Sequence, residues 1–159
     1  MDVKKLKWCY NQNKGLKIIK PNENLAKEYI ESAEETLMIL QEIGDKSNMW
    51  LSTTKYYCEY FSIYALLMKF GVKSEIHDCT IELSKFLENK NLIPKGFTKV
   101  LERDKELRID NQYYLKNRKV ELDFEELRDF VLTIKNKINS ITTEEIAQIR
   151  KDLDNLIKF

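Results

Sequence analysis

The sequence predicts an all-α protein, an up-and-down antiparallel bundle of four to six helices. The chain has 159 residues but only 4 Gly and 2 Pro, so few residues interrupt helices. Hydrophobic residues make up 43%, which is enough for a core in a chain of this length. In most segments the apolar residues recur at helical spacing. No repeat or linker divides the chain, so we expect one bundle domain at 21–159, preceded by a basic arm at 1–20.

The first twenty residues combine six lysines with Trp8, Tyr10 and several aliphatic residues. We expect an irregular or short helical arm that docks onto the bundle through its aromatic residues, with a disordered arm as the alternative. The lysines of such an arm can contact phosphates. They are equally compatible with an arm that is simply solvated.

Two long helices should follow the arm. Pro21-Asn22 is a start signal for a helix that reaches Ile43 and ends at Gly44. Ser47 can cap the next helix, which runs to Phe70 and ends at Gly71. That helix is apolar on more than one face, which is typical of the central helix of a bundle or of a helix that also forms a subunit contact.

Capping and turn signals divide the rest of the chain. Because the connections between the first three bundle helices are short, we expect these helices to be neighbours and to pack antiparallel. The remaining expected elements are a helix at 74–88 capped by Ser74, a loop at 89–96, a helix at 98–115, a charged link at 117–121, a helix at 123–139 with a capping box from Asp123 and Glu126, and a helix from Thr142 to about Ile157.

Charge and motifs exclude several classes of protein. The 27 Lys and Arg nearly balance the 26 Asp and Glu, which argues against nucleic-acid binding by bulk charge but leaves room for a local basic patch. The sequence has no Gly-rich phosphate loop and only one His. We therefore expect no metal site and no cofactor.

The cysteines and the hydropathy indicate a cytoplasmic protein. Cys9, Cys58 and Cys79 are odd in number and far apart in the sequence, so we expect three separate thiols in a reducing compartment. No apolar stretch is long enough to span a membrane. The charged N-terminus also lacks the pattern of a secretory signal peptide.

Four short patterns occur in a characteristic order. Tyr29 and Ala33 share the first long helix, and Tyr56-Tyr57 begins a run that leads through Ala65-Leu66-Leu67 to Gly71. His77 follows, and Arg108 and Tyr113 come later. Together these patterns resemble the uncharacterised prokaryotic branch of the HEPN domains (higher eukaryotes and prokaryotes nucleotide-binding), over roughly residues 14–140. Asn111 and Gln112 depart from the Ala-Asp that this branch carries before the tyrosine.

The resemblance implies a helical bundle that forms a homodimer through residues 47–88, with His77 near the two-fold axis. Many HEPN proteins are paired with a minimal nucleotidyltransferase in toxin–antitoxin systems. The active toxins are metal-independent ribonucleases, and their motif separates an Arg from a His by four to six residues. Homodimerisation, a nucleotidyltransferase partner, and RNA or a nucleotide as ligand are therefore expectations for this chain.

The ribonuclease motif is incomplete here. His77 has the family's position, but Phe70, Gly71 and Val72 occupy the positions expected for the Arg. The nearest cations are Lys69, one residue too far away, and Lys73, one residue too close. Lysine also lacks the bidentate fork of arginine. We therefore expect a non-catalytic or weakly catalytic interaction or nucleotide-binding module.

Two other functions stay open. One is an RNA-cleaving toxin in which His77 is the base and Lys73 or Arg108 is the phosphate cation. The other is a purely structural subunit without a ligand.

Each candidate residue also has a structural interpretation. His77 can form a hydrogen bond across the bundle, and Arg108 can pair with Glu106 or Asp104 or bind a helix C-terminus. Tyr57, Tyr60 and Tyr113 are the candidate ligand-binding aromatics. The tyrosines at 56–64 can instead belong to the core or to a dimer contact.

Overall fold

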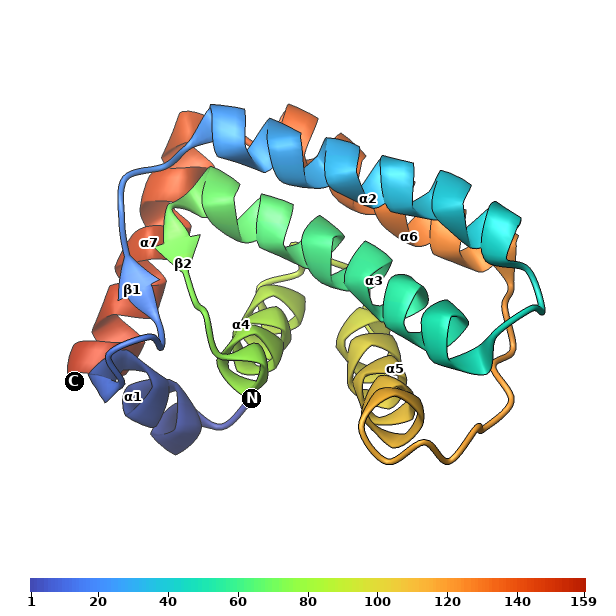
Figure 1. Ribbon diagram of the computed structural model, residues 1–159. Coiled ribbons are helices and arrows are strands. Elements are labelled where there is room, and N and C mark those ends of the chain that lie inside the picture. Colours follow the sequence, from blue (N-terminus) through green and yellow to red (C-terminus); the bar gives the residue numbers. More distant parts are fainter.

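The computed structural model describes all residues, 1–159, and contains seven helices and one small sheet (Figure 1). The all-α prediction is confirmed, with six helices within residues 21–159 and the seventh within the first twenty residues. The elements are α1 (Val3–Asn11), β1 (Lys17–Ile18), α2 (Glu23–Ile43), α3 (Asn48–Phe70), β2 (Val72–Lys73), α4 (His77–Asn89), α5 (Phe97–Gln112), α6 (Phe124–Ser140) and α7 (Thr143–Lys158).

The long helices α2, α3 and α6 lie side by side, while α4 and α5 lie below α3 and point across it (Figure 1). Helices α1 and α7 pack together at one end of the molecule. The short turn after Gly44 makes α2 and α3 antiparallel, as expected. The expectation that α4 runs alongside α3 is wrong, because the strand β2 and the turn after it redirect the chain before α4 begins.

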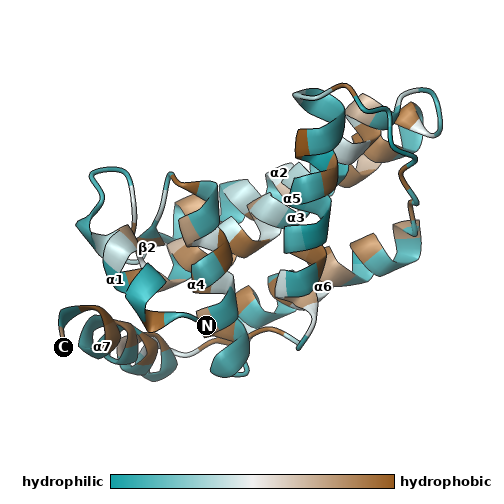
Figure 2. Ribbon diagram, turned by 90° about the horizontal axis from the view of Figure 1, so that it is seen from below, coloured by the Kyte–Doolittle hydropathy of each residue, from teal (hydrophilic) through white to brown (hydrophobic).

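Helix α3 is the centre of the fold. Side chains on every face of it are buried, including Tyr56, Ile63, Leu66 and Phe70. Figure 2 shows that the hydrophobic residues of the surrounding helices gather on their inner sides. The sequence-based assignment of this segment as the central helix is confirmed, and its neighbours α2, α5 and α6 enclose it.

Most helix ends follow the expected caps. The Ser47 hydroxyl accepts a hydrogen bond from the Trp50 amide at 3.2 Å, and the Asp123 carboxylate accepts one from the Glu126 amide at 3.0 Å. The reciprocal capping box forms only in α7, from Thr142 and Glu145. Ser74 does not cap α4, because its hydroxyl donates to the Ile76 carbonyl and the helix begins at His77.

The first twenty residues form α1 and β1. Leu6, Cys9 and Leu16 are fully buried and hold this segment to the rest of the protein. Strand β1 pairs with β2 antiparallel, with Lys17 opposite Lys73. The expected docking by aromatic residues is wrong for Trp8, which is 50% exposed, because the buried face of α1 is aliphatic.

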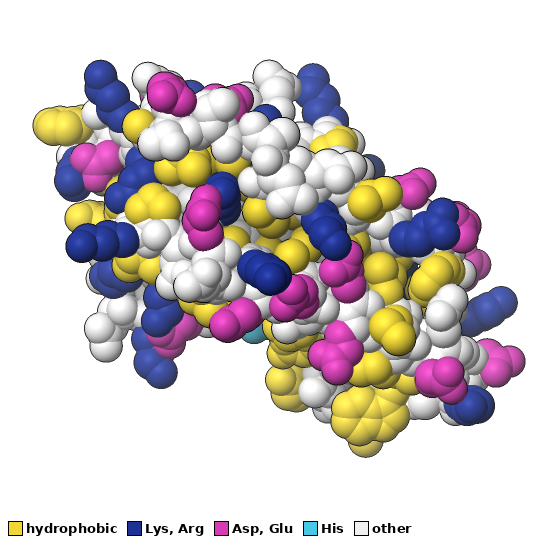
Figure 3. Space-filling model, turned by 90° about the horizontal axis from the view of Figure 1, so that it is seen from above, with side chains coloured by type: hydrophobic (Ala, Val, Ile, Leu, Met, Phe, Trp, Pro, Cys, Tyr) yellow, Lys and Arg dark blue, Asp and Glu magenta, His cyan; other side chains and the backbone are white.

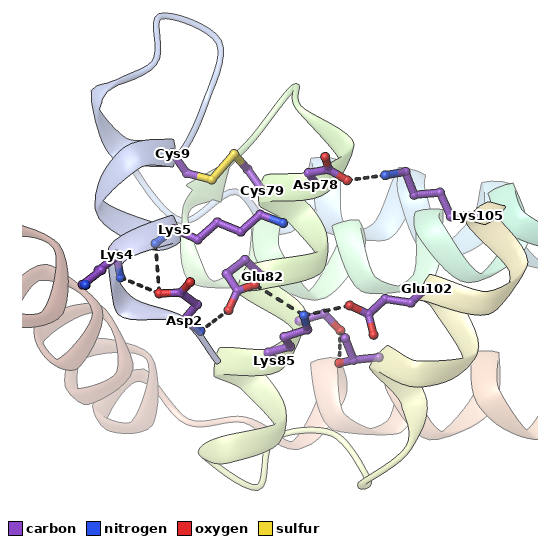
Figure 4. A network of polar contacts seen from close by, with 12 residues as sticks. Asp2, Lys4, Lys5, Cys9, Asp78, Cys79, Glu82, Lys85, Glu102 and Lys105 are labelled. Atoms are coloured by element: carbon purple, nitrogen blue, oxygen red, sulfur yellow. Dashed lines mark hydrogen bonds and ion pairs between the residues drawn. A yellow bond between two sulfur atoms is a disulfide. The ribbon is translucent and has the colours of Figure 1, made fainter. Parts of the chain in front are cut away.

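Cys9 and Cys79 form a disulfide between α1 and α4 (Figure 4), and Cys58 is a buried free thiol. The expectation of three separate thiols is therefore wrong. The two bonded cysteines are 70 residues apart, and only the packing of α1 on α4 brings them together. The prediction of a reducing compartment depended on unpaired thiols and loses that support.

Charges of both signs are interspersed on the surface. Figure 3 shows basic and acidic side chains mixed over one face, without a continuous field of either sign. This agrees with the near-neutral composition. None of the seven helices combines the length and the apolar composition that a bilayer span requires.

Candidate ligand-binding site

His77 lies at the start of α4 and faces the tyrosines of α3. Its Nδ1 is 2.6 Å from the Tyr56 hydroxyl. Its ring stacks on the Tyr60 ring, with 4.6 Å between the ring centroids. The turn that follows β2 starts α4 at this residue, and this start places the imidazole below the middle of α3.

Arg108 reaches the same tyrosines from α5. Its guanidinium carbon lies 4.7 Å from the centre of the Tyr56 ring and 5.4 Å from that of Tyr57. Its Nη1 donates a hydrogen bond to the Tyr57 hydroxyl at 3.1 Å. Through Tyr56, the imidazole of His77 and the guanidinium of Arg108 therefore belong to one cluster.

Arg108 is only 6% exposed, and yet no carboxylate pairs with it. Its Nε is buried without any hydrogen-bond partner. The expected ion pair with Asp104 or Glu106 is wrong, because Asp104 is occupied by Lys55 at 3.0 Å and by Arg103 at 2.9 Å. Burying an unpaired charge is costly, and contact with two aromatic rings offsets only part of that cost.

A second cation lies beside the imidazole. Lys105 on α5 forms an ion pair with Asp78, the residue after His77 (Figure 4). Farther along the same two helices, Lys85 of α4 pairs with Glu102 of α5 at 2.7 Å. These two pairs hold α4 against α5 and so maintain the position of His77 relative to Arg108.

The cluster shifts the acid–base behaviour of its members. Burial lowers the pKa of His77, and the positive charges of Arg108 and Lys105 lower it further, with Asp78 opposing them. Burial raises the pKa of the Tyr56 hydroxyl, which therefore keeps its proton. Burial likewise raises the pKa of Tyr60 to about 12.

The cluster includes most of the candidate residues that the sequence suggested. Tyr57 and Tyr60 surround the imidazole, and the exposed Tyr113 has its ring centre 5.9 Å from the guanidinium carbon of Arg108. Of the tyrosines at 56–64, Tyr56, Tyr60 and Tyr64 are buried, as the core interpretation expected. Tyr57 is half-buried at the edge of the cluster.

Lys73 does not join the cluster. It is an exposed residue of β2, and its ammonium group pairs with Glu75 at 2.9 Å. The charges that act on His77 come instead from Arg108, Lys105 and Asp78. Lys105 was not among the residues that the sequence suggested, although its position three residues before Arg108 on one helix face was a usable signal.

Comparison of the chain with protein-family models, with curated proteins and with solved structures gives no match. Functional conclusions for this protein therefore depend on the geometry of the cluster.

We expect the imidazole of His77 to titrate below its ordinary pKa of 6.5, and Arg108→Met to move the pKa back up. The chain has one His, so its ring signals in an NMR pH titration need no assignment. Arg128→Met, which changes an exposed residue of α6, is the matched control and should leave the titration unchanged. An unaltered pKa in Arg108→Met would show that this guanidinium does not act on the imidazole.

The same shift has a consequence for stability. Below pH 6.5 the unfolded chain takes up a proton at His77 before the folded protein does, so protons favour unfolding. We expect this histidine's contribution to the free energy of unfolding to be fully present above that pH. It should be lost as the pH falls through the folded-state pKa. Urea unfolding of wild type and His77→Gln across this range measures the difference.

Proposed function

We propose that this protein is a HEPN-type helical module that binds a phosphate-bearing ligand, a nucleotide or RNA, at the cluster of His77 and Arg108 without cleaving it. One observation carries the proposal. Arg108 is buried beside a histidine and has no acidic partner. A phosphate oxygen would supply the missing negative charge, and the guanidinium fork suits phosphate geometry.

The tautomer of His77 favours binding over base catalysis. The buried Tyr56 hydroxyl keeps its proton, and the Nδ1 of His77 is its only hydrogen-bond partner. A buried hydroxyl donor is satisfied if it donates to that nitrogen. The neutral imidazole then carries its own proton on Nε2, where it can donate to a ligand oxygen. A general base would need this nitrogen free.

The positions of the missing motif arginine support the same conclusion. Phe70 is fully buried, and Gly71 forms the left-handed turn that ends α3. Val72 is buried in the small sheet. No cation projects from this segment toward the imidazole, and Lys73 pairs with Glu75 instead.

Ribonuclease activity is the second candidate function, and the lowered pKa of His77 is the observation that favours it. A histidine that is neutral near physiological pH, with Arg108 and Lys105 close by, has the charge state that a general base requires. Such a mechanism would need the Tyr56 hydroxyl to accept a hydrogen bond from Nδ1 rather than donate one.

The experiment measures binding of a short, fluorescently labelled RNA of mixed sequence by anisotropy in excess EDTA. Wild type should bind. Arg108→Met should weaken binding by about tenfold to a hundredfold, which corresponds to the loss of one charged hydrogen-bonding group. Arg128→Met is the control. ATP is tested as a second ligand in the same way. The proposal is wrong if wild type binds neither ligand, or if Arg108→Met binds as tightly as wild type.

Cleavage is read from the same samples on a denaturing gel, with His77→Ala run beside wild type. Intact RNA supports a binding module. Products that form with wild type and disappear with His77→Ala would replace the proposal by the ribonuclease function.

Arg108→Met should also separate a binding role from a structural one. Because the wild-type guanidinium is buried without an acid, we expect the variant to melt at the same temperature or higher in the absence of ligand. Thermal unfolding followed by circular dichroism tests this. A clear loss of stability would identify Arg108 as a structural residue.

We also propose that the protein acts as a homodimer or with a nucleotidyltransferase-type partner. Tyr113, Tyr114 and Leu115 are 65–72% exposed at the end of α5, and Tyr113 borders Arg108. Exposed apolar residues next to a binding cluster are typical of an interface.

If this surface forms a homodimer, light scattering should give twice the chain mass for wild type and the single mass for Leu115→Glu. An unchanged mass would remove this surface from the dimer.

A further inference from the structure

A second polar site lies on the flank of α5 that faces away from α4. A cavity of about 1070 Å³ opens there between α3, α5, α6 and the segment 118–123. Val100, Arg103 and Leu107 of α5 line it, whereas Lys105 and Arg108 face the His77 cluster. This volume is close to the upper end of the range for small-molecule binding sites, about 1,000 Å³.

Glu59 forms part of the inner wall of this cavity. Its side chain is completely buried, and neither carboxyl oxygen receives a hydrogen bond. Buried carboxyl groups are almost always supplied with donors, because the desolvation cost of an unpaired one is high. Glu59 is the only acidic residue of α3, a helix with buried residues on every face.

The neighbouring charges are already committed to each other. Lys55 and Arg103 both pair with Asp104, at 3.0 and 2.9 Å. Lys55 also donates to the Glu121 carbonyl at 3.3 Å. Neither of these two cations pairs with Glu59.

The mouth of the cavity has an excess of acid. Besides Glu59, seven carboxylates and five cations line it. Lys55 and Arg103 pair with Asp104. Arg118 and Glu125 pair with residues outside the lining, Asp110 and Arg128. Five carboxylates and two lysines of the lining are left without a partner of opposite charge. The rest of the wall includes apolar side chains such as Phe97, Leu127 and Phe130.

We propose that this cavity binds an aliphatic polyamine, with one ammonium group paired with Glu59 and the others near the acidic mouth. The ammonium supplies the donors that Glu59 lacks, and the methylene chain packs on the apolar wall. A bare metal ion is a poorer fit, because no group of three or more metal-binding side chains lies together in the structure. The proposal is independent of the function proposed for the His77 cluster.

Binding at Glu59 should be linked to a proton. Burial raises the pKa of this carboxyl, and the nearby Asp104 carboxylate raises it further, while Lys55 and Arg103 oppose the shift. An ammonium that pairs with Glu59 must displace this proton. Affinity should therefore fall as the pH is lowered, and binding should release a proton to the buffer.

Titration calorimetry of spermidine into the full chain tests the proposal at about pH 6, in two buffers with different ionisation enthalpies. Wild type should bind with a one-site isotherm and release a proton. Glu59→Gln, which keeps the shape of the side chain, should weaken binding about tenfold or more and abolish the proton release. Glu35→Gln on the exposed face of α2 is the matched control.

Three outcomes would overturn the proposal. The first is the absence of saturable spermidine binding by the folded wild type. The second is equal binding by Glu59→Gln, with circular dichroism showing that the variant is folded. The third is equal competition by Mg²⁺, which would mean diffuse attraction to the acidic mouth rather than a polyamine site.

Discussion

Gly71→Ala should lower the free energy of unfolding by about 3 kcal/mol or more. Gly71 ends α3 in the left-handed region, at φ 71°. A Cβ at this position would lie 2.4 Å from the Nη1 of Arg150 and 2.5 Å from the Ile19 carbonyl oxygen. The backbone strain of alanine is small by comparison, so the clash should dominate the loss.

The clash falls where three parts of the chain meet. The Nη1 of Arg150, on α7, donates hydrogen bonds to the carbonyls of Ile19, Phe70 and Gly71 at 2.7, 2.7 and 3.1 Å. The Ile19 amide also donates to the Gly71 carbonyl at 2.8 Å. An added methyl group must separate the β1 segment from the end of α3, and the bonds to Arg150 would be lost with it.

Gly96→Ala is the control. Its φ of 99° is at least as unfavourable for alanine, but no atom lies within 4 Å of the added Cβ. It should cost only the conformational strain, about 1–2 kcal/mol. Urea unfolding of both variants compares the two costs. Equal losses would mean that the contact with Arg150 and Ile19 is not tight in solution.

The sequence predicted the helices well because their ends are marked by local chemistry. Gly44 and Gly71 end α2 and α3, and Ser47 and Asp123 cap α3 and α6, as expected. The start of α4 was predicted too early, at Ser74. The pairing of β1 with β2 decides this boundary, and a pairing across more than fifty residues leaves no local signal.

The candidate site was foreseen in its residues but not in its contacts. The order of the motifs suggested His77, Arg108, Tyr57, Tyr60 and Tyr113, and the fold brings these together. The absence of an acidic partner for Arg108 was not predictable. An arginine with an acid at helical spacing, such as Asp104, is ordinarily expected to pair with it. Only the packed structure shows that Asp104 is already occupied.

The remaining errors concern two charged side chains. Lys73 is near His77 in the sequence, yet the extended geometry of β2 directs it to Glu75. Glu59 was not among the candidate residues that the sequence suggested. An acidic residue in a helix expected to be buried on more than one face was the signal to follow.

Removing the disulfide between the buried Cys9 and Cys79 should also be strongly destabilising. It closes a loop between residues 70 apart, and the loss of that constraint on the unfolded chain corresponds to about 4 kcal/mol. We expect the free energy of unfolding of wild type, measured in urea, to fall by this amount when a reductant is added. Cys9→Ala/Cys79→Ala should already have the lower stability and respond to the reductant no further.

Thiol titration of the denatured wild type provides the independent check. It should give one reactive thiol, from Cys58, without reductant and three after reduction. Three thiols from the start would mean that the bond does not form in the protein as isolated, and the reductant should then have no effect on unfolding.

Loss of the disulfide should nevertheless leave the His77 cluster largely intact. Cys79 is two residues from His77, but the bond joins α4 to α1, whereas Lys105 and Lys85 hold α4 to α5 through Asp78 and Glu102. Because those ion pairs do not involve α1, the reduced protein should melt at a lower temperature and still bind the labelled RNA with its original affinity. A parallel loss of affinity would instead mean that α1 controls the position of His77.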